Sequence, residues 1–218
     1  MGQRRLAIYG GTFDPVHNGH LEVARRVQKL FEMDELILVP ACTPPHKRSA
    51  SITSGFHRFA MLALATQSDE KFRISTIELD QPESPYAIDT VSRLRTEFGS
   101  NHRLFFLIGA DSWEEITTWR EWQRLLRMCD LIVVTRPGYD LVERAPIEGV
   151  CIVDVRGQKQ VSLRENQRPG IFLSDAANVD VSATAIRAAA RANNSEALRV
   201  MMPAVVVDYI VKQKLYRN

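Results

Sequence analysis

The chain has 218 residues, an apolar content of 45% and a formal net charge of +2. Charges this evenly balanced exclude the strongly basic or acidic surface that attracts nucleic acid or anionic lipid, so we expect neither nucleic acid nor a membrane as a partner. The length suits one domain with a large core, and we expect residues 1–218 to form a single domain.

The cysteines and the apolar runs indicate where the protein works. Cys42, Cys129 and Cys151 lie far apart and form no Cys-x-x-Cys pair, which argues against a disulfide framework or a structural zinc site. Reduced thiols fit the cytosol. No apolar run has the length of a transmembrane helix, and the run near the N-terminus is too short for a signal peptide. The sequence therefore predicts a cytoplasmic protein.

The first predicted element is a short buried strand at residues 6–9, and a helix follows it. The helix is predicted because apolar residues recur on one helical face. These residues are Leu21, Val23, Ala24, Val27, Leu30 and Phe31. Residues 10–20 lie between the two elements and read Gly-Gly-Thr-Phe-Asp-Pro-Val-His-Asn-Gly-His. This stretch is a strand-to-helix turn that opens a βαβ unit.

The residue types of this turn are those of a phosphate site. Gly10 and Gly11 allow turn geometry and the close approach of a ligand, and Pro15 fixes the backbone before the helix. A helix N-terminus offers free N–H groups and a positive dipole end. His17 and His20 are three residues apart, so both lie on the same side of the first turn. The stretch is neither a Walker loop nor a Gly-x-Gly-x-x-Gly dinucleotide fingerprint.

The next elements continue the alternation of strands and helices. Residues 35–40 form a run that is apolar throughout after Glu35, which is typical of a buried parallel strand, and a loop stiffened by Pro44 and Pro45 follows. A helix is expected to begin near Thr53 and Ser54. Its apolar positions are Phe56, Phe59, Met61, Leu62 and Leu64. A strand at 72–77 and a helix at 86–98, stopped by Gly99, come next.

The second half of the chain repeats this pattern. A hydrophobic strand at 103–108 leads into a polar turn at 109–113 and then into short helical pieces through residue 128. Further strands are predicted at 130–135, 150–155 and 170–173. Residues 156–169 are polar and lack periodicity, so we expect a surface loop that folding does not need. Helices at 183–192, 195–200 and 204–216 complete the chain, with Pro203 at a helix start.

Alternating strands and helices predict an α/β fold, a doubly wound Rossmann-like parallel sheet with C-terminal helices. In such sheets ligands bind beyond the carboxyl ends of the strands, where the strand order switches. The polar turns follow strands or lie where they can reach that edge. We therefore expect them to meet in one site.

Two further groups of residues are candidates for that site. Lys47, beside His46 in the proline-rich loop, can place a positive charge over phosphates, although a lone loop lysine is usually solvated. Ser182 is a natural N-cap, Thr184 lies in the first helical turn, and Arg187 follows one turn later. Hydroxyls, free N–H groups and a guanidinium would converge on an anion there, although an ordinary capped helix accounts for the same residues equally well.

Together these stretches resemble the bacterial nicotinate-nucleotide adenylyltransferases, in the nucleotidyltransferase superfamily with its glycine-rich turn before His-x-Gly-His. The matching stretches keep the family's order and span roughly residues 5–216. They are residues 10–20, 44–47, 86–90, 109–111 with Trp119, and 182–187. The resemblance implies transfer of AMP from ATP to nicotinate mononucleotide, which gives nicotinate adenine dinucleotide and pyrophosphate in a step of NAD biosynthesis.

The resemblance also implies roles for individual residues on the ATP side. Catalytic roles fall to His17, His20, Lys47 and Arg187. ATP binding falls to Gly10, Gly11, Thr12, Phe13, Gly109, Asp111, Arg136, Ser182 and Thr184. Mg²⁺ is the implied cofactor and would be held mainly by the ATP phosphates, so no protein metal ligand is predicted. No general base is needed, because a phosphate monoester is already largely ionised at neutral pH.

On the acceptor side, the implied nicotinate mononucleotide contacts are His46, Tyr86, Ala87, Thr90, Trp119 and Arg120. Trp119 would stack on the pyridine ring, although a half-buried tryptophan that only anchors a helix would give the same sequence pattern. The family usually has Thr at the position of Ala87 and often Tyr at that of Arg120. Without the hydroxyl, backbone N–H groups at the start of the 86–98 helix remain for the carboxylate. Arg120 either adds a compensating charge or is a solvated surface residue.

Two other functions remain open from the sequence. One is pantetheine-phosphate adenylyltransferase or another nucleotidyltransferase, although the pantetheine enzymes favour Thr at the position of His17. The other is a catalytically silent nucleotide-binding protein on the same fold, against which the intact His17, His20, Lys47 and Arg187 argue. A homo-oligomer is compatible with the sequence.

Overall fold

The computed structural model describes residues 3–42, 52–81, 85–135, 150–163, 169–177 and 181–217. Its strands are β1 (Arg4–Gly11), β2 (Glu35–Pro40), β3 (Phe72–Ile74), β4 (His102–Gly109), β5 (Asp130–Val134), β6 (Cys151–Asp154) and β7 (Gly170–Ser174). They form one sheet in the order β3-β2-β1-β4-β5-β7-β6, and every neighbouring pair is parallel. The fold class predicted from the sequence is confirmed.

The helices alternate with these strands along the chain. They are α1 (Asn18–Leu30), α2 (Gly55–Thr66), α3 (Ala87–Phe98), α4 (Ala110–Glu114), α5 (Trp122–Met128), α6 (Ala183–Arg191), α7 (Ser195–Met201) and α8 (Ala204–Lys212), with a short 3-10 helix η2 (Ile116–Thr118). Three expectations were wrong in detail. The strand expected at 72–77 ends at Ile74, the polar turn expected at 109–113 becomes α4, and α8 ends before residue 216. No helix within the described ranges combines the length and the apolar character needed to cross a membrane.

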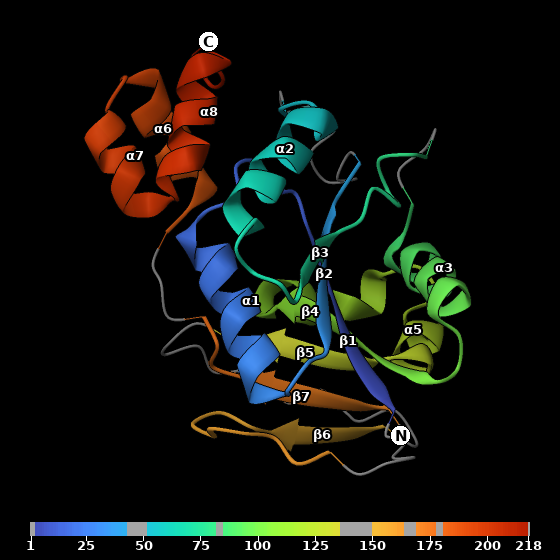
Figure 1. The fold of residues 1–218 in the computed structure, drawn as a ribbon. Helices are drawn as coiled ribbons and strands as arrows, with labels where there is room; N and C mark the ends of the chain where they lie inside the picture. The colour runs from blue at the N-terminus through green and yellow to red at the C-terminus, as the bar shows by residue number, and fades with distance from the viewer. Residues whose placement is uncertain are drawn as a thin grey trace.

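Two hydrophobic cores cover the two faces of the sheet, because successive strand residues point to opposite sides. Ala7, Leu36 and Phe105 face the core shared with α1 and α2. Leu6, Ile37 and Leu104, their chain neighbours, face the core shared with α3 and α5. Figure 1 shows α1 and α2 on one side of the sheet and α3 and α5 on the other.

The strand order switches direction next to β1. The chain moves from β1 to β2 and β3 on one side, then returns to β4 and β5 on the other side, where β6 forms the sheet edge and β7 lies between β5 and β6. The switch therefore lies between β1 and β4, which end at Gly11 and Gly109 respectively. Ligands of doubly wound sheets bind at this point.

The C-terminal helices α6, α7 and α8 gather beside α1 and α2 (Figure 1). Polar contacts fix them there. The amide of Asn18, the first residue of α1, donates to the carbonyl of Val200 at 3.0 Å. The Tyr209 hydroxyl of α8 lies 2.8 Å from Nδ1 of His57 in α2. The C-terminal helices are thus attached to α1, which follows the glycine-rich turn, and to α2.

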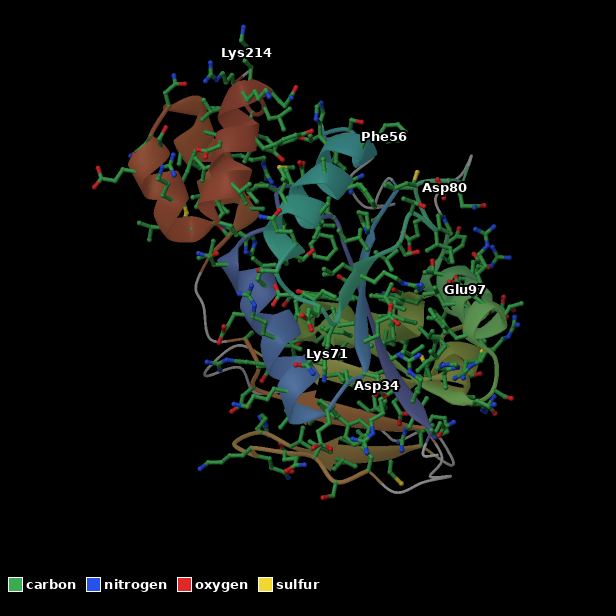
Figure 2. The ribbon with its side chains drawn as sticks, viewed as in Figure 1. Asp34, Phe56, Lys71, Asp80, Glu97 and Lys214 are labelled. Atoms are coloured by element: carbon green, nitrogen blue, oxygen red, sulfur yellow. The ribbon has the colours of Figure 1, made fainter. Side chains whose placement is uncertain are left out.

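One sequence expectation about exposure was wrong. Phe56, expected on the apolar face of α2, is 83% exposed, and Figure 2 shows it at the first turn of that helix. Residues 156–163, a described part of the surface loop expected at 156–169, contain neither helix nor strand and are mostly exposed, as predicted, but one residue anchors them. Val161 is 4% exposed, and its N–H donates to the carbonyl of Leu30 at 2.8 Å. This segment therefore packs on the end of α1.

Candidate active site

The turn between β1 and α1 is shaped by the ring of Phe13. Phe13 has a φ of 47°, the left-handed region that non-glycine residues seldom adopt. Its ring packs edge-on against Tyr9 and His20, with centroids 5.5 and 5.0 Å apart. A β-carbon at Gly11 would lie 2.9 Å from that ring, so only glycine fits there. Gly10 and Gly11 belong to β1 itself, and it is Phe13 that takes the turn conformation.

His17 and His20 stack on one another in the first turn of α1. Their ring centroids are 3.7 Å apart and the rings are nearly parallel. Burial, and then the charge of His17, lower the pKa of His20 well below its ordinary value. His20 is therefore neutral at pH 7. Its buried Nδ1 has no hydrogen-bond partner within the part of the chain that the structure describes.

The first cavity, of about 470 Å³, opens above these histidines. It brings together eight of the residues predicted for ATP binding and catalysis. They are Thr12, Phe13, His17, His20, Gly109, Asp111, Ser182 and Arg187. A β-carbon at Gly109 would meet no protein atom within 4 Å, which leaves open space against the strand end. Asp111 follows on α4 with an exposed side chain.

The α6 end of this cavity is built around a capped helix. The Ser182 hydroxyl accepts a hydrogen bond from the Ala185 N–H at 3.2 Å, as predicted for an N-cap. Arg187 donates to the carbonyl of Asp14 at 2.7 Å and to the Thr184 hydroxyl at 3.2 Å. Thr184, which was predicted to bind ATP, is exposed and does not line the cavity. Its hydroxyl contacts Arg187 instead.

The second cavity, of about 430 Å³, lies on the other side of the β1 and β4 ends. Predicted residues on its wall are Gly10, Gly11, Tyr86, Ala87, Trp119 and Arg120. The Arg120 guanidinium lies 5.0 Å from the centroid of the Tyr86 ring, and both side chains are exposed. Trp119 packs edge-on against Phe106 at 6.4 Å. An aromatic and cationic rim thus surrounds this cavity.

Thr90 does not line the second cavity, contrary to its predicted binding role. It is 2% exposed, and its hydroxyl donates to the Glu78 carboxylate at 2.7 Å. Glu78, which sequence reasoning missed, lies on the wall instead. Burial raises the pKa of Glu78, while the bond from Thr90 acts in the opposite direction. No motif surrounds Glu78 in the sequence, so burial in the fold is its only signal.

The two cavities adjoin along a shared wall. Tyr9, Thr12, Leu107, Ile108 and Gly109 line both. These residues come from the carboxyl-terminal ends of β1 and β4 and from the turn after β1. The sheet therefore presents two neighbouring compartments at its switch point, as expected for a site that brings two substrates together.

Arg58 is a second residue that sequence reasoning missed. Its side chain is 1% exposed and donates to three backbone carbonyls, at 2.9 Å to Thr53, 2.7 Å to Thr12 and 2.9 Å to Cys42. Burial lowers the pKa of this guanidinium. A single buried cation therefore joins the turn after β1, the end of the β2 strand and the start of α2. An arginine among apolar helix residues was its only signal in the sequence.

Three predicted site residues, His46, Lys47 and Arg136, lie outside the described residues. Within the described ranges, no group of three or more His, Cys, Asp or Glu side chains is arranged to hold a metal ion.

Comparison with known proteins gives the family. A family profile described as Cytidylyltransferase-like matches residues 8–189. A relative from Thermoanaerobacter sp. (strain X514), named a probable nicotinate-nucleotide adenylyltransferase, is 36% identical over 98% of this chain and 95% of its own. A relative of the same name from Citrifermentans bemidjiense is 34% identical over 97% of this chain and 98% of its own.

Solved structures agree on the fold. The Plasmodium falciparum nicotinic acid mononucleotide adenylyltransferase complexed with NaAD superposes with a TM-score of 0.72 at 20% identity, over 98% of this chain and 97% of that one. The same enzyme complexed with APC gives a TM-score of 0.69 at 21% identity. From these matches, the chain belongs to the Cytidylyltransferase-like family and, within it, to the nicotinate-nucleotide adenylyltransferases.

Proposed function

We propose that this protein transfers AMP from ATP to nicotinate mononucleotide, forming nicotinate adenine dinucleotide and pyrophosphate in NAD biosynthesis. The observation that carries this function is the pair of adjoining cavities at the β1–β4 switch. One cavity has imidazoles and a guanidinium for phosphates, and the other has an aromatic rim for a pyridine ring. Two nucleotides seated in them would meet at the shared wall.

In the first cavity, the ATP phosphates lie against His17, His20 and the N-terminus of α1. The dipole and the free N–H groups of a helix start favour such an anion. The ribose of ATP lies near Gly109 and Asp111, and Arg187 with Ser182 faces the pyrophosphate end. Lys47 and Arg136 are assigned to the phosphates on the sequence pattern.

In the second cavity, the pyridine ring of the acceptor stacks on Trp119. The N–H group of Ala87, the first residue of α3 and part of this cavity wall, has no acceptor within the helix and is assigned to the nicotinate carboxylate. The Tyr86 N–H is not available, because it donates to the Asp89 carboxylate at 3.1 Å. His46 is assigned to the acceptor on the sequence pattern alone.

The reaction then needs alignment more than acid–base chemistry. A phosphate oxygen of nicotinate mononucleotide attacks the α-phosphorus of ATP, and the bond from that phosphorus to the bridging oxygen breaks. The electron pair leaves with pyrophosphate. The attacking phosphate is already ionised at neutral pH, so no base has to remove a proton. The neutral imidazole of His20 can donate an N–H to charge that grows in the transition state.

Mg²⁺ is the proposed accompanying cation. Mg²⁺ is usually bound through one or two carboxylates together with substrate phosphates and water. The described wall of the first cavity fits an ion held mainly by the ATP phosphates and water, because its two carboxylates are Asp14, which is engaged within the protein, and Asp111, which is assigned to the ribose. When bound, the ion neutralises part of the charge on the leaving pyrophosphate.

The direct test is product formation from ATP and nicotinate mononucleotide, followed as dinucleotide and pyrophosphate. We expect turnover by the wild type and a fall in kcat of about 10²–10³ in His20→Ala, the scale seen when one transition-state donor is lost. His102→Ala is the matched control, because His102 is a half-buried histidine at the opposite end of β4. A near-normal kcat in His20→Ala would remove this residue from the mechanism.

A further inference from the structure

Asp14 lines the first cavity, yet its carboxylate is turned to the protein. One oxygen accepts from the Tyr216 hydroxyl at 2.7 Å and the other from the Thr53 N–H at 3.3 Å. Its backbone carbonyl accepts from Arg187. The side chain is 6% exposed, so these partners replace water around it. Asp14 is therefore a junction between the phosphate-binding turn, the segment before α2 and the C-terminal helices.

Tyr216 reaches this junction from the far end of the chain. The helix α8 ends in a Schellman motif, in which Lys214 donates to Val211 at 3.2 Å and Leu215 to Ile210 at 3.0 Å. Lys214 has a φ of 54° and projects into solvent (Figure 2), whereas Tyr216, with a φ of 62°, is half-buried against Asp14. Left-handed non-glycine residues persist only where the surroundings hold them. The bond to Asp14 provides such a hold.

The turn that Tyr216 contacts is also fixed at its other end. Arg58 holds the carbonyl of Thr12, two residues before Asp14, at 2.7 Å. Residues 12–14 are thus held from α2, from α6 and from the C-terminal end. Backbone donors that stabilise developing charge must already be in place before reaction, because moving them costs free energy at that moment.

We propose that Tyr216 is a positioning residue for adenylyl transfer, acting through Asp14 to hold the phosphate-binding turn in its reactive geometry. This inference rests on the proposed function. Tyr216 itself does not line either cavity, so it acts without touching substrate. The C-terminal helices then belong to the working site and not only to the stability of the fold.

The same helices offer a matched control. Tyr209 lies in α8, shortly before the segment that carries Tyr216, is also half-buried and makes a side-chain bond to another element, at 2.8 Å to His57. That bond attaches the helix to α2 away from both cavities. Removing the hydroxyl of Tyr216 or of Tyr209 deletes a hydrogen bond that attaches the C-terminal segment to the rest of the protein. Only loss of the hydrogen bond to Asp14 should lower kcat.

The experiment compares Tyr216→Phe, Tyr209→Phe, Asp14→Asn and the double variant Tyr216→Phe with Asp14→Asn, all in the full chain. Melting temperatures and steady-state kinetics with ATP and nicotinate mononucleotide are measured for each. In Tyr216→Phe we expect kcat to fall about tenfold, in keeping with the sensitivity of positioned reactions to small displacements. The KM for nicotinate mononucleotide should stay within threefold, because Trp119 and α3 do not contact Asp14. Tyr209→Phe should keep the wild-type kcat.

The double variant separates positioning from general stability. An Asn at position 14 presents its NH₂ to one of two donors and so must lose one bond. If Tyr216 acts through Asp14, adding Tyr216→Phe to Asp14→Asn should lower kcat by less than twofold more. A fall in kcat of the double variant equal to the product of the two single falls would contradict the proposal. So would a kcat of Tyr216→Phe within twofold of the wild type. Equal falls in kcat in Tyr216→Phe and Tyr209→Phe would contradict it as well. If Tyr216→Phe does not fold, Asp14→Asn alone tests the hydrogen bond through its accepting residue. A wild-type kcat in Asp14→Asn would then contradict the proposal. Absence of product from the wild type would instead contradict the proposed function.

Discussion

His17 and His20 bring two titratable rings to within 3.7 Å of each other in a largely buried turn. Two positive charges so close repel, and burial disfavours even one, which is why the pKa of His20 is lowered. In the native state His20 therefore takes up a proton only well below the ordinary histidine value of about 6.5. A bound triphosphate adds negative charge beside the same ring. ATP binding should then raise this pKa toward its ordinary value.

The expected result is proton uptake on ATP binding in mildly acidic solution. At pH 6 the free protein keeps His20 neutral, and the complex protonates it in part. Calorimetric titration with ATP in two buffers of different ionisation enthalpy measures the protons taken up. His20→Asn should remove this contribution and leave only the protons that belong to ATP. Identical uptake by the variant and the wild type would show that His20 does not face the phosphates.

The same shift has a consequence for stability. The unfolded chain binds a proton at His20 near pH 6.5, whereas the native chain does not, so the native state loses stability as the pH falls below that value. The loss continues until the lowered native pKa is reached. Above about pH 7 His20 is neutral in both the native and the unfolded state, so its contribution to stability no longer changes with pH.

At the scale of elements, helix endings explain where the sequence misled. The helix α3 ends at Gly99, as predicted, with a φ of 75°. Lys214 takes the corresponding left-handed position after α8, and Glu32 does so after α1. These are residue types that carry no stop signal. The apolar pattern continues past Lys212, so the sequence extended α8 to residue 216. Tertiary contact, not local preference, ends that helix.

The anchor at Val161, in the segment 156–163, was missed for a related reason. The segment has no periodic pattern, and its contacts are made by single residues. Leu30 is the last residue of α1, so its carbonyl has no partner within the helix. The Val161 N–H supplies one, and the Gln160 amide donates to Glu32 at 2.7 Å. A segment that caps a helix end in this way cannot be recognised from composition.

Val161→Ala should therefore destabilise the protein, although it lies in a polar stretch. Removing two buried methyl groups at a site that is 4% exposed should cost about 1.5–3 kcal/mol in free energy of unfolding. Denaturant unfolding measures the loss. Ser162→Ala, one residue further on at an exposed position, is the control and should change stability by less than about 0.5 kcal/mol. An unchanged midpoint in Val161→Ala would show that this residue does not anchor the segment.

At the scale of the whole molecule, the sequence predicted the sheet, and most of the candidate residues that the structure describes lie on a cavity wall. Periodicity and turn residues are local, and the phosphate motif is a single continuous stretch. Arg58, Glu78 and Tyr216 were missed because their roles come from long-range contacts. Tyr216 meets Asp14 across 202 positions of sequence, and no local pattern encodes such a pair. Thr90 was assigned to substrate for the converse reason, since its motif gives no sign of the half-buried Glu78 that accepts the hydrogen bond of its hydroxyl.

We propose that the acceptor is selected in the second cavity. Nicotinate and nicotinamide rings stack equally well, so a stacking Trp119 cannot separate them. Selection would then fall to the carboxylate end, where Ala87 offers an N–H donor and Arg120 lies on the rim. An amide would turn its NH₂ toward that donor and leave it unpaired, which can cost several powers of ten in kcat/KM.

The most direct measurement is kcat/KM for nicotinate mononucleotide and for nicotinamide mononucleotide, in wild type, Arg120→Ala and the control Arg124→Ala. Arg124 is an exposed arginine four residues further on that pairs with Glu121 and lies outside both cavities. We predict that the wild type prefers the acid by several powers of ten. A preference kept in Arg120→Ala assigns selection to the backbone donor, and one lost only in that variant assigns it to the guanidinium. Equal kcat/KM values for the two substrates in the wild type would contradict the assignment to nicotinate mononucleotide.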